Sequence, residues 1–215
     1  MRTAFILTLL ATSLTCSAQN FTFVFLNNKP DKQVLPPEES KKIMDGHMAN
    51  INRLAQEGKL IAAGPFDGGG GIFIFKTTSA DEAKEWLSTD PGVLANRWNV
   101  ELLAYHPRTG SACAVSEPYE MVMYTFVRFT AQVTKSTTGN YPDILKRHDD
   151  YIKEQFSKTG NVITEGIFGE YDGGILVLKG ELQKEIFEAD PGVQEALLQF
   201  DIKKLHIAKG SFCER

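Results

Sequence analysis

The sequence has few cysteines and no apolar run long enough to cross a membrane. Only three of its 215 residues are cysteine, Cys16, Cys113 and Cys213, and no Cys-x-x-Cys pair occurs. A cysteine-based zinc site is therefore not indicated. Residues 4–14 form the longest apolar stretch, whereas a transmembrane helix needs about 20 residues. We expect no membrane span.

Excess positive charge is also missing. Lys and Arg number 23 against 27 Asp and Glu, which gives a formal net charge of −4. Binding to a nucleic-acid backbone needs a basic face or stripe, so we predict no nucleic-acid partner. Hydrophobic residues make up 42% of the chain, enough for one or two globular domains at this length.

The first eighteen residues have the layout of a secretory signal. Arg2 supplies the positive start, residues 4–14 the apolar region, and Cys16-Ser17-Ala18 a small-residue cleavage site. We expect the mature chain to begin at Gln19 and to be periplasmic or secreted. The alternative is a lipoprotein anchored through Cys16.

The remainder of the chain contains an internal repeat. Residues 57–66 correspond to 159–168, and the Asp-Pro-Gly-Val at 90–93 recurs at 190–193, with offsets between 100 and 103. Such a constant offset predicts a tandem duplication. The predicted parts are a signal at 1–18, repeats at 20–107 and 120–208, a linker at 108–119 and a tail at 209–215.

Each repeat predicts the order strand, helix, strand, strand, helix, strand, which is the ferredoxin-like split βαβ arrangement. In the first repeat we expect strands at 21–26, 60–66, 72–76 and 100–105 and helices at 38–56 and 80–88. In the second we expect strands at 121–129, 162–168, 175–179 and 202–207 and helices at 142–158 and 182–188.

The predicted fold class is α+β. Two helices cover only one face of each unit's sheet, so the other apolar face needs a partner. We predict that the two repeats pack these faces together as an intramolecular dimeric α+β barrel, closed or nearly closed. One repeat alone should be poorly soluble or should associate with itself.

Cys113 and Cys213 each lie seven residues after a histidine near the end of a repeat, His106 or His206. A two-fold arrangement would bring both cysteines near its axis, and disulfides persist outside the cytoplasm. We expect a disulfide between them. Two independent thiols are the alternative.

Two histidines lie on the apolar faces of corresponding predicted helices. Residues three and four positions away share a helix face, and around His47 and His148 these are mostly apolar. They are Ile43, Met44, Asn50 and Ile51 in the first helix, and Ile144, Leu145, Tyr151 and Ile152 in the second. A buried imidazole without a partner costs about 1–3 kcal/mol, so each histidine should have a hydrogen-bonding companion.

Asp90 and Asp190, 43 and 42 residues downstream, are the candidate companions. A carboxylate beside an imidazole fixes its tautomer and prepares it for proton transfer. The structural alternative is that Asp-Pro-Gly starts a helix with Asp as its cap, and that each histidine is a satisfied core residue. The two roles of an aspartate are compatible.

Other candidates are weaker. We expect His106 and His206 to lie at the surface near strand ends. The glycines at 68–71 lack the Lys-Ser/Thr of a phosphate loop and predict a hairpin turn. No nucleophile-elbow motif and no metal-ligand set with helical spacing is present, so we expect no metal and no cofactor.

With these residues in place, the chain resembles the YCII family over 21–107 and 121–208. The resemblance rests on the helix histidine in His-Met-Ala-Asn-Ile-Asn-Arg-Leu from His47, the Glu-Gly-Lys-Leu-Ile-Ala-Ala-Gly-Pro from Glu57, and the Asp-Pro pairs at 90 and 190. The second copy departs from the pattern, with Ile167 in place of a proline and an insert at 130–141.

The resemblance implies a dimeric α+β barrel with a His–Asp site, carried here by His47 with Asp90 and by His148 with Asp190. It implies little about the reaction, although one similar enzyme removes chloride from a hydroxylated aromatic ring. The second site is the less secure of the two because its surrounding motif is degraded.

Our leading hypothesis is a cofactor-independent small-molecule enzyme that eliminates or isomerises, of the lyase, isomerase or dehydrochlorinase type. His47 would act as general base or acid and Asp90 would orient it. The competing hypothesis is a ligand-binding or scaffold protein that retains the barrel without chemistry. Further homo-oligomerisation stays open.

Overall fold

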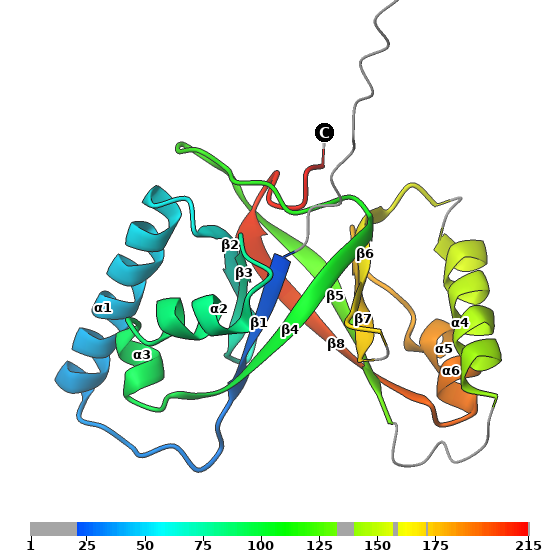
Figure 1. Ribbon diagram of the computed structural model, residues 1–215, viewed down its shortest axis with the longest axis horizontal. Helices are drawn as coiled ribbons and strands as arrows, with labels where there is room; N and C mark the ends of the chain where they lie inside the picture. Colours follow the sequence, from blue (N-terminus) through cyan, green and yellow to red (C-terminus); the bar gives the residue numbers. More distant parts are fainter. Residues whose placement is uncertain (1–20, 133–139, 157–158, 171, 215) are drawn as a thin grey trace, which may run out of the picture.

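The computed structural model describes residues 21–132, 140–156, 159–170 and 172–214 (Figure 1). The predicted signal with Cys16 and Gln19 lies outside the described residues. So do residues 133–139 of the predicted insert and the predicted helix end at Lys158.

The two halves of the chain have the same order of elements. The first half contains β1 (Phe21–Asn28), α1 (Pro37–Gln56), β2 (Leu60–Pro65), β3 (Gly71–Phe75), α2 (Ala80–Leu87), α3 (Pro91–Leu94) and β4 (Trp98–Thr109). The second half contains β5 (Met121–Ala131), α4 (Tyr141–Phe156), β6 (Val162–Phe168), β7 (Gly173–Leu178), α5 (Lys184–Glu188), α6 (Pro191–Gln194) and β8 (Leu198–Ala208). Every predicted strand and helix is present, and the glycines at 68–71 connect β2 to β3 as expected.

The last strand of each half is longer than predicted, so His106 lies within a strand and not just after one. His106 lies three residues before the end of β4 and is half-buried. His206 lies two residues before the end of β8 with its side chain 41% exposed, in agreement with the expected surface position near a strand end. The prediction ended the first of these strands at Tyr105. In the structure β4 continues past it, and the pairing with β6 shifts register between Pro107 and Thr109.

The strands form one eight-stranded antiparallel sheet in the order β2-β3-β1-β4-β6-β7-β5-β8. The halves join where β4 pairs with β6, with Tyr105 opposite Phe168. The outermost strands in this order also approach each other. The Asp67 amide just after β2 donates to the Lys204 carbonyl of β8 at 3.0 Å.

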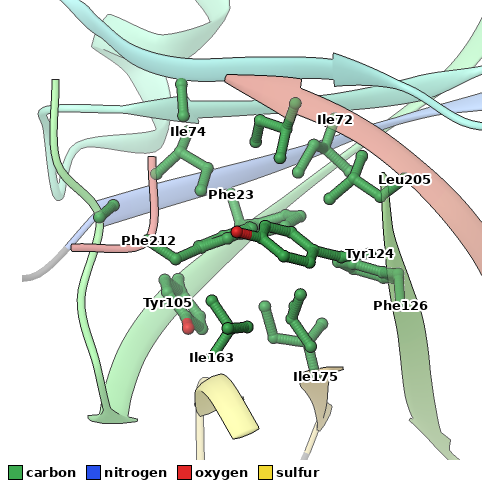
Figure 2. Close-up of a cluster of buried hydrophobic side chains, with 14 of the residues drawn as sticks. Phe23, Ile72, Ile74, Tyr105, Tyr124, Phe126, Ile163, Ile175, Leu205 and Phe212 are labelled. Carbon is green, nitrogen blue, oxygen red and sulfur yellow. The ribbon is translucent and has the colours of Figure 1, made fainter. Parts of the chain in front are cut away.

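The hydrophobic core has a central layer to which both halves contribute (Figure 2). The Phe23 ring lies 5.3 Å from Tyr105, 5.4 Å from Phe168 and 6.2 Å from Phe126, measured between ring centroids. Two further cores lie beneath the helices, one in each half. Because side chains alternate across a strand, each half presents one sheet face to its own helices and the other to the opposite half (Figure 1).

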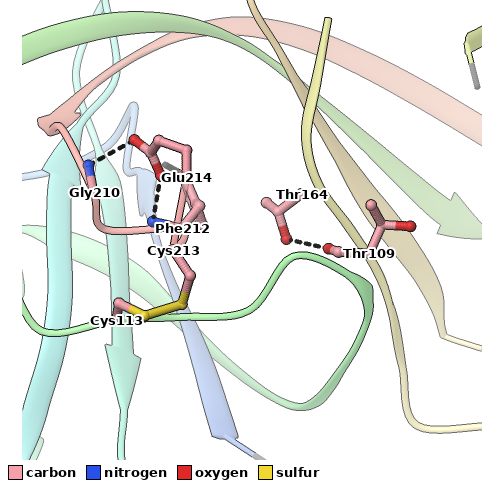
Figure 3. The surroundings of a disulfide bond; sticks show 7 residues. All are labelled: Thr109, Cys113, Thr164, Gly210, Phe212, Cys213 and Glu214. Atoms are coloured by element: carbon pink, nitrogen blue, oxygen red, sulfur yellow. Dashed lines mark hydrogen bonds between the residues drawn. A yellow bond between two sulfur atoms is a disulfide. The ribbon is translucent and has the colours of Figure 1, made fainter. Parts of the chain in front are cut away.

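The predicted disulfide between Cys113 and Cys213 is confirmed, with the Cα atoms 5.1 Å apart (Figure 3). The Cys113 amide also donates to the Ser211 carbonyl at 2.9 Å. Nearby, the Glu214 carboxylate accepts from the Gly210 amide at 2.7 Å and the Phe212 amide at 3.0 Å. The segment between β4 and β5 is thus fastened to the chain that follows β8. No helix in the described residues is long and apolar enough to span a membrane.

Candidate active site

His47 lies on the buried face of α1, the longest helix of the described chain. Pro37 occupies the first helical turn, acidic side chains follow it, and Arg53 lies in the last turn, in the order that the helix dipole favours. The imidazole is 6% exposed. It lies between two aromatic rings, 5.7 Å from Phe73 and 4.8 Å from Trp98 between centroids.

Asp90 combines the two roles that its sequence context predicted separately. Its Oδ1 atom caps α3 by accepting from the Gly92 amide at 2.8 Å and the Val93 amide at 3.1 Å. Its Oδ2 atom lies 2.8 Å from His47 Nδ1. One carboxylate therefore holds a helix start and an imidazole together.

Two glycines allow the close approach of α1, α3 and β4 that forms this pair. A methyl group at Gly46 would lie 2.9 Å from the Pro91 ring, and one at Gly92 would lie 2.3 Å from the Trp98 ring. Distances below 3.0 Å would force these elements apart. The backbone at these positions thus brings the His47 turn of α1 against the start of α3.

A polar network that sequence analysis did not single out surrounds the pair. Asn50 Nδ2 donates to Asp90 Oδ2 at 3.2 Å. The side-chain oxygen of Asn50, Oδ1, in turn accepts from Arg53 Nη2 at 2.8 Å and from Thr89 Oγ1 at 2.9 Å. Asn50 follows His47 by three residues on the same helix face, and that spacing was the available signal for it.

The environment of Asp90 favours its ionised form. Complete burial raises the pKa of this carboxyl, but the hydrogen bond from His47, the attraction of its ring, the Val93 amide and the Asn50 amide together lower it. The net effect is a pKa below the usual range. With an ionised carboxylate on Nδ1, that nitrogen carries the proton and Nε2 is the atom available to a ligand.

His47 lines a cavity of about 720 Å³. Its walls are largely apolar and include Met44, Met48, Phe73 and Trp98, together with Tyr119 from the segment before β5. This size lies within the range of about 300–1,000 Å³ that is typical of small-molecule sites. The imidazole is thus placed at the wall of a space that a small organic molecule could occupy.

The second predicted pair has the same core geometry. His148 Nδ1 of α4 lies 2.6 Å from Asp190 Oδ2, and Asp190 Oδ1 accepts from the Gly192 amide at the start of α6 at 2.7 Å. The residue in the place of Asn50 is Tyr151, whose hydroxyl donates to the Ile186 carbonyl at 2.7 Å. The amide donor found in the first half is therefore replaced by a side chain directed elsewhere.

The space that His148 itself lines is smaller, about 90 Å³. A neighbouring hollow of about 590 Å³ shares Arg108, Asp149 and Glu165 with it but is not lined by His148. Arg108, which comes from β4 of the other half, lies at both spaces with its two acidic partners. Its Nη1 and Nη2 atoms each donate to an Asp149 carboxylate oxygen at 2.8 Å, and its Nε donates to Glu165 at 2.8 Å. An ion-pair network thus lines the second cavity.

The corresponding residues at the first cavity, two from the first half and one from β8 of the second, are all uncharged. Following the offsets of the repeat, Met48 corresponds to Asp149, Ala63 to Glu165 and Ala208 to Arg108. All three line the larger cavity. The two cavities therefore differ through a swap of three apolar residues for a charged triad.

The remaining histidines contribute to neither cavity. His206 Nε2 lies 2.6 Å from Asp67 Oδ1 in an exposed pair, and His106 lies within β4. Within the part of the chain that the structure describes, no three His, Cys, Asp or Glu side chains gather in a way that could hold a metal ion.

The YCII-related domain family matches residues 21–103, which hold both His47 and Asp90. The resemblance over 121–208 stays a prediction because the match covers the first half only. No protein of curated function matches the chain.

Two solved structures align with most of this chain. One is named "Putative Chlorite dismutase TA0507", with 6% identity, a TM-score of 0.53, and coverage of 89% of this chain and 96% of that one. The other is named "Putative monooxygenase (FN1347)" from Fusobacterium nucleatum subsp. nucleatum ATCC 25586, with 11% identity, a TM-score of 0.46, and coverage of 90% and 94%. At 6% identity the first likeness concerns the fold alone: antiparallel, ferredoxin-type α+β.

Proposed function

We propose that this protein is a small-molecule enzyme in which His47 transfers a proton and Asp90 orients and stabilises the imidazole. One observation carries the proposal: the 2.8 Å contact between His47 Nδ1 and Asp90 Oδ2 lies at the wall of a cavity of about 720 Å³. Perturbed carboxylates paired with histidine in such a cavity are typical of acid–base sites.

The geometry supports a simple sequence of proton movements. His47 Nε2 takes a proton from a substrate carbon made acidic by a neighbouring carbonyl group. Asp90 stabilises the imidazolium that forms, because its Oδ2 atom already accepts from Nδ1. The electron pair left on carbon then expels a leaving group, which is elimination, or takes the proton back at another atom, which is isomerisation. Neither route requires a cofactor.

We propose that the second pair, His148 with Asp190, is a structural counterpart with weak or no turnover. His148 lines only a space of about 90 Å³, which is small for a metabolite, and Arg108 with its two acidic partners lines both this space and the hollow of about 590 Å³ beside it. Asp190 still caps α6 through the Gly192 amide. The pair can therefore stabilise the fold without a substrate.

We further propose that the chain arose by tandem duplication of a YCII-like unit and closes as an intramolecular dimeric α+β barrel. The identical element order of the halves, the central core they share and the contact between β2 and β8 support this proposal. The Cys113–Cys213 disulfide supports export to the periplasm or beyond, since disulfides persist there. Anchoring through Cys16 is the alternative mode of export.

The test is a screen for small molecules that raise the melting temperature, followed by NMR detection of turnover for each one that binds. His47→Ala should reduce turnover by about 100- to 10,000-fold while the protein stays folded. His148→Ala is the matched control and should retain most of the activity. Full turnover by folded His47→Ala would refute the assignment.

A binding protein without chemistry is the second candidate, favoured by the bonds of Asp90 to the α3 amides, which a purely structural aspartate would also make. In that case, molecules that stabilise the wild type would bind without conversion. His47→Ala would then change only their affinity.

A further inference from the structure

We propose that the cavity beside His47 binds an organic anion: a molecule with an apolar body and one negatively charged group. The inference rests on the proposed function only in taking this cavity as the substrate site. It names the class of ligand, which the His–Asp pair alone does not specify.

The charged side chains at this cavity are all of one sign. Among the described residues that line it are Lys32 and Arg97, and none is aspartate or glutamate. This is unusual for a chain with a formal net charge of −4. A concave site lined by a single sign of charge attracts ligands of the opposite sign.

Neither cation is neutralised by a described acidic side chain. Arg97 donates from Nη1 to the Gln33 carbonyl at 2.7 Å, which holds the guanidinium in place without cancelling its charge. Lys32 forms no ion pair within the described part of the chain. Both charges are therefore available to a ligand.

The carboxylate of Asp90 does not face the cavity. Asp90 is fully buried and does not line the space. Its two oxygens are already bonded to His47, Asn50 and the amides of Gly92 and Val93. His47 therefore lines the cavity, whereas Asp90 lies behind it and does not.

The remaining wall suits an apolar body. Met44, Met48 and Met121 line the cavity, and they are 40%, 52% and 52% exposed. Methionine adapts its shape to a ligand and contacts aromatic or aliphatic groups equally well. Exposed methionines around a concave site are consistent with a surface that a ligand covers.

The second cavity provides an internal comparison. There the one arginine, Arg108, is bonded to both Asp149 and Glu165, so its charge is cancelled by the protein itself. The first cavity has Met48 and Ala63 at those two positions. The absence of carboxylates from the wall of the first cavity is therefore a difference between two otherwise similar sites.

The test uses two fluorescent probes with the same apolar body, 8-anilinonaphthalene-1-sulfonate, which is anionic, and N-phenyl-1-naphthylamine, which is neutral. Each is titrated into the full-length wild type and into Lys32→Met/Arg97→Met. The double variant should weaken sulfonate binding about tenfold, the size expected for lost hydrogen bonds to a charged group. Binding of the neutral probe should change less than about twofold.

Two further variants locate the effect. Lys42→Met removes a positive charge from α1 at a residue that does not line the cavity, and it should leave both affinities unchanged. Met48→Asp imports the residue of the second half and should weaken sulfonate binding more than neutral binding, whereas Met48→Leu should not.

Equal effects of the double variant on both probes, unchanged sulfonate affinity, or no sulfonate binding by the wild type would overturn the inference. These binding results are independent of turnover. If His47→Ala abolishes turnover but probe binding ignores charge, the anion inference fails and the enzyme proposal stands. If the charge dependence holds and His47→Ala retains turnover, the reverse is true.

Discussion

Met48 and Asp149 each follow the helix histidine of their half, and they give the two cavities opposite character. Met48 lines an open, apolar space, whereas Asp149 binds Arg108 through both carboxylate oxygens at 2.8 Å. Since Arg108 belongs to β4, the first half supplies the residue that restricts the site of the second. The two cavities thus differ because a contact between the halves, Arg108 with Asp149, is present at the second cavity and has no counterpart at the first.

Replacing the charged triad should open the second cavity. In Arg108→Ala/Asp149→Met/Glu165→Ala, the side chains beside His148 match those beside His47, and the cavity should grow well beyond its present 90 Å³ or so. A crystal structure and the number of neutral probe molecules bound per chain, rising from one to two, would show this. Lys146→Ala/Asp150→Ala removes an exposed ion pair of α4 and is the matched control. An unchanged cavity in the triple variant would contradict the prediction.

Asp90 should make stability depend on pH in the acidic range. Its pKa is lower in the folded protein than the ordinary value of about 4. Its contribution to the free energy of unfolding is therefore present above that value and lost as the pH falls through the folded pKa. Urea unfolding between pH 3 and 7 should show this decline for the wild type and a flatter profile for Asp90→Asn.

Truncation of the same residue should cost more than loss of its charge. Asp90→Ala removes the cap of α3 and leaves His47 and Asn50 without their acceptor, so we expect a loss of about 2–4 kcal/mol at pH 7. Asp67→Asn, at the exposed partner of His206, is the control and should leave the pH profile unchanged. If Asp90→Ala is as stable as the wild type, the pair has no structural role.

The disulfide should contribute strongly to stability because it closes a long loop. Cys113 and Cys213 are 100 residues apart, and chain entropy alone predicts roughly 2–5 kcal/mol for such a link. Unfolding midpoints measured with and without a reducing agent should differ accordingly. Cys113→Ser/Cys213→Ser should match the reduced wild type and should not respond to reductant. Identical midpoints for oxidised and reduced protein would be evidence against this contribution.

Residues 20–107 expressed alone should associate or precipitate. In the full chain, Phe23, Phe25 and Ile74 pack into the central core against the other half, and separation would expose this face to water. Sedimentation velocity should show dimers or larger species, and co-expression with residues 120–215 should restore a soluble pair. A soluble monomer of the first half would mean that its inner face does not need a partner.

Local patterns in the sequence predicted most of the fold. Hydrophobic periodicity located the strands and long helices of both halves, and the constant offset between Asp90 and Asp190 matched two equivalent helix starts. The short helices α3 and α6 were expected only as capped starts, since four residues are too few to show a period. The end of β4 was predicted too early, at residue 105, because the strand continues through Pro107 and a shift in its pairing with β6.

The histidine–aspartate contacts were also predictable, whereas their surroundings were not. A buried imidazole needs a hydrogen-bonding partner, and from the sequence alone this requirement indicated Asp90 and Asp190. The contact of Arg108 with Glu165 spans 57 residues and depends on the pairing of β4 with β6 across the halves. Nothing local to Arg108 in the sequence indicates that pairing.

In both halves one carboxylate holds a helix start through Oδ1 and an imidazole through Oδ2, so the residue proposed to assist His47 is also one that the fold needs. A descendant that no longer needed the reaction would still lose stability on losing the aspartate, so selection for a folded chain alone would preserve the pair. The presence of the histidine–aspartate pair in a related sequence is therefore weak evidence that the related protein is active. The side chains around the neighbouring cavity, which folding constrains less, are the better record of whether a substrate is still bound.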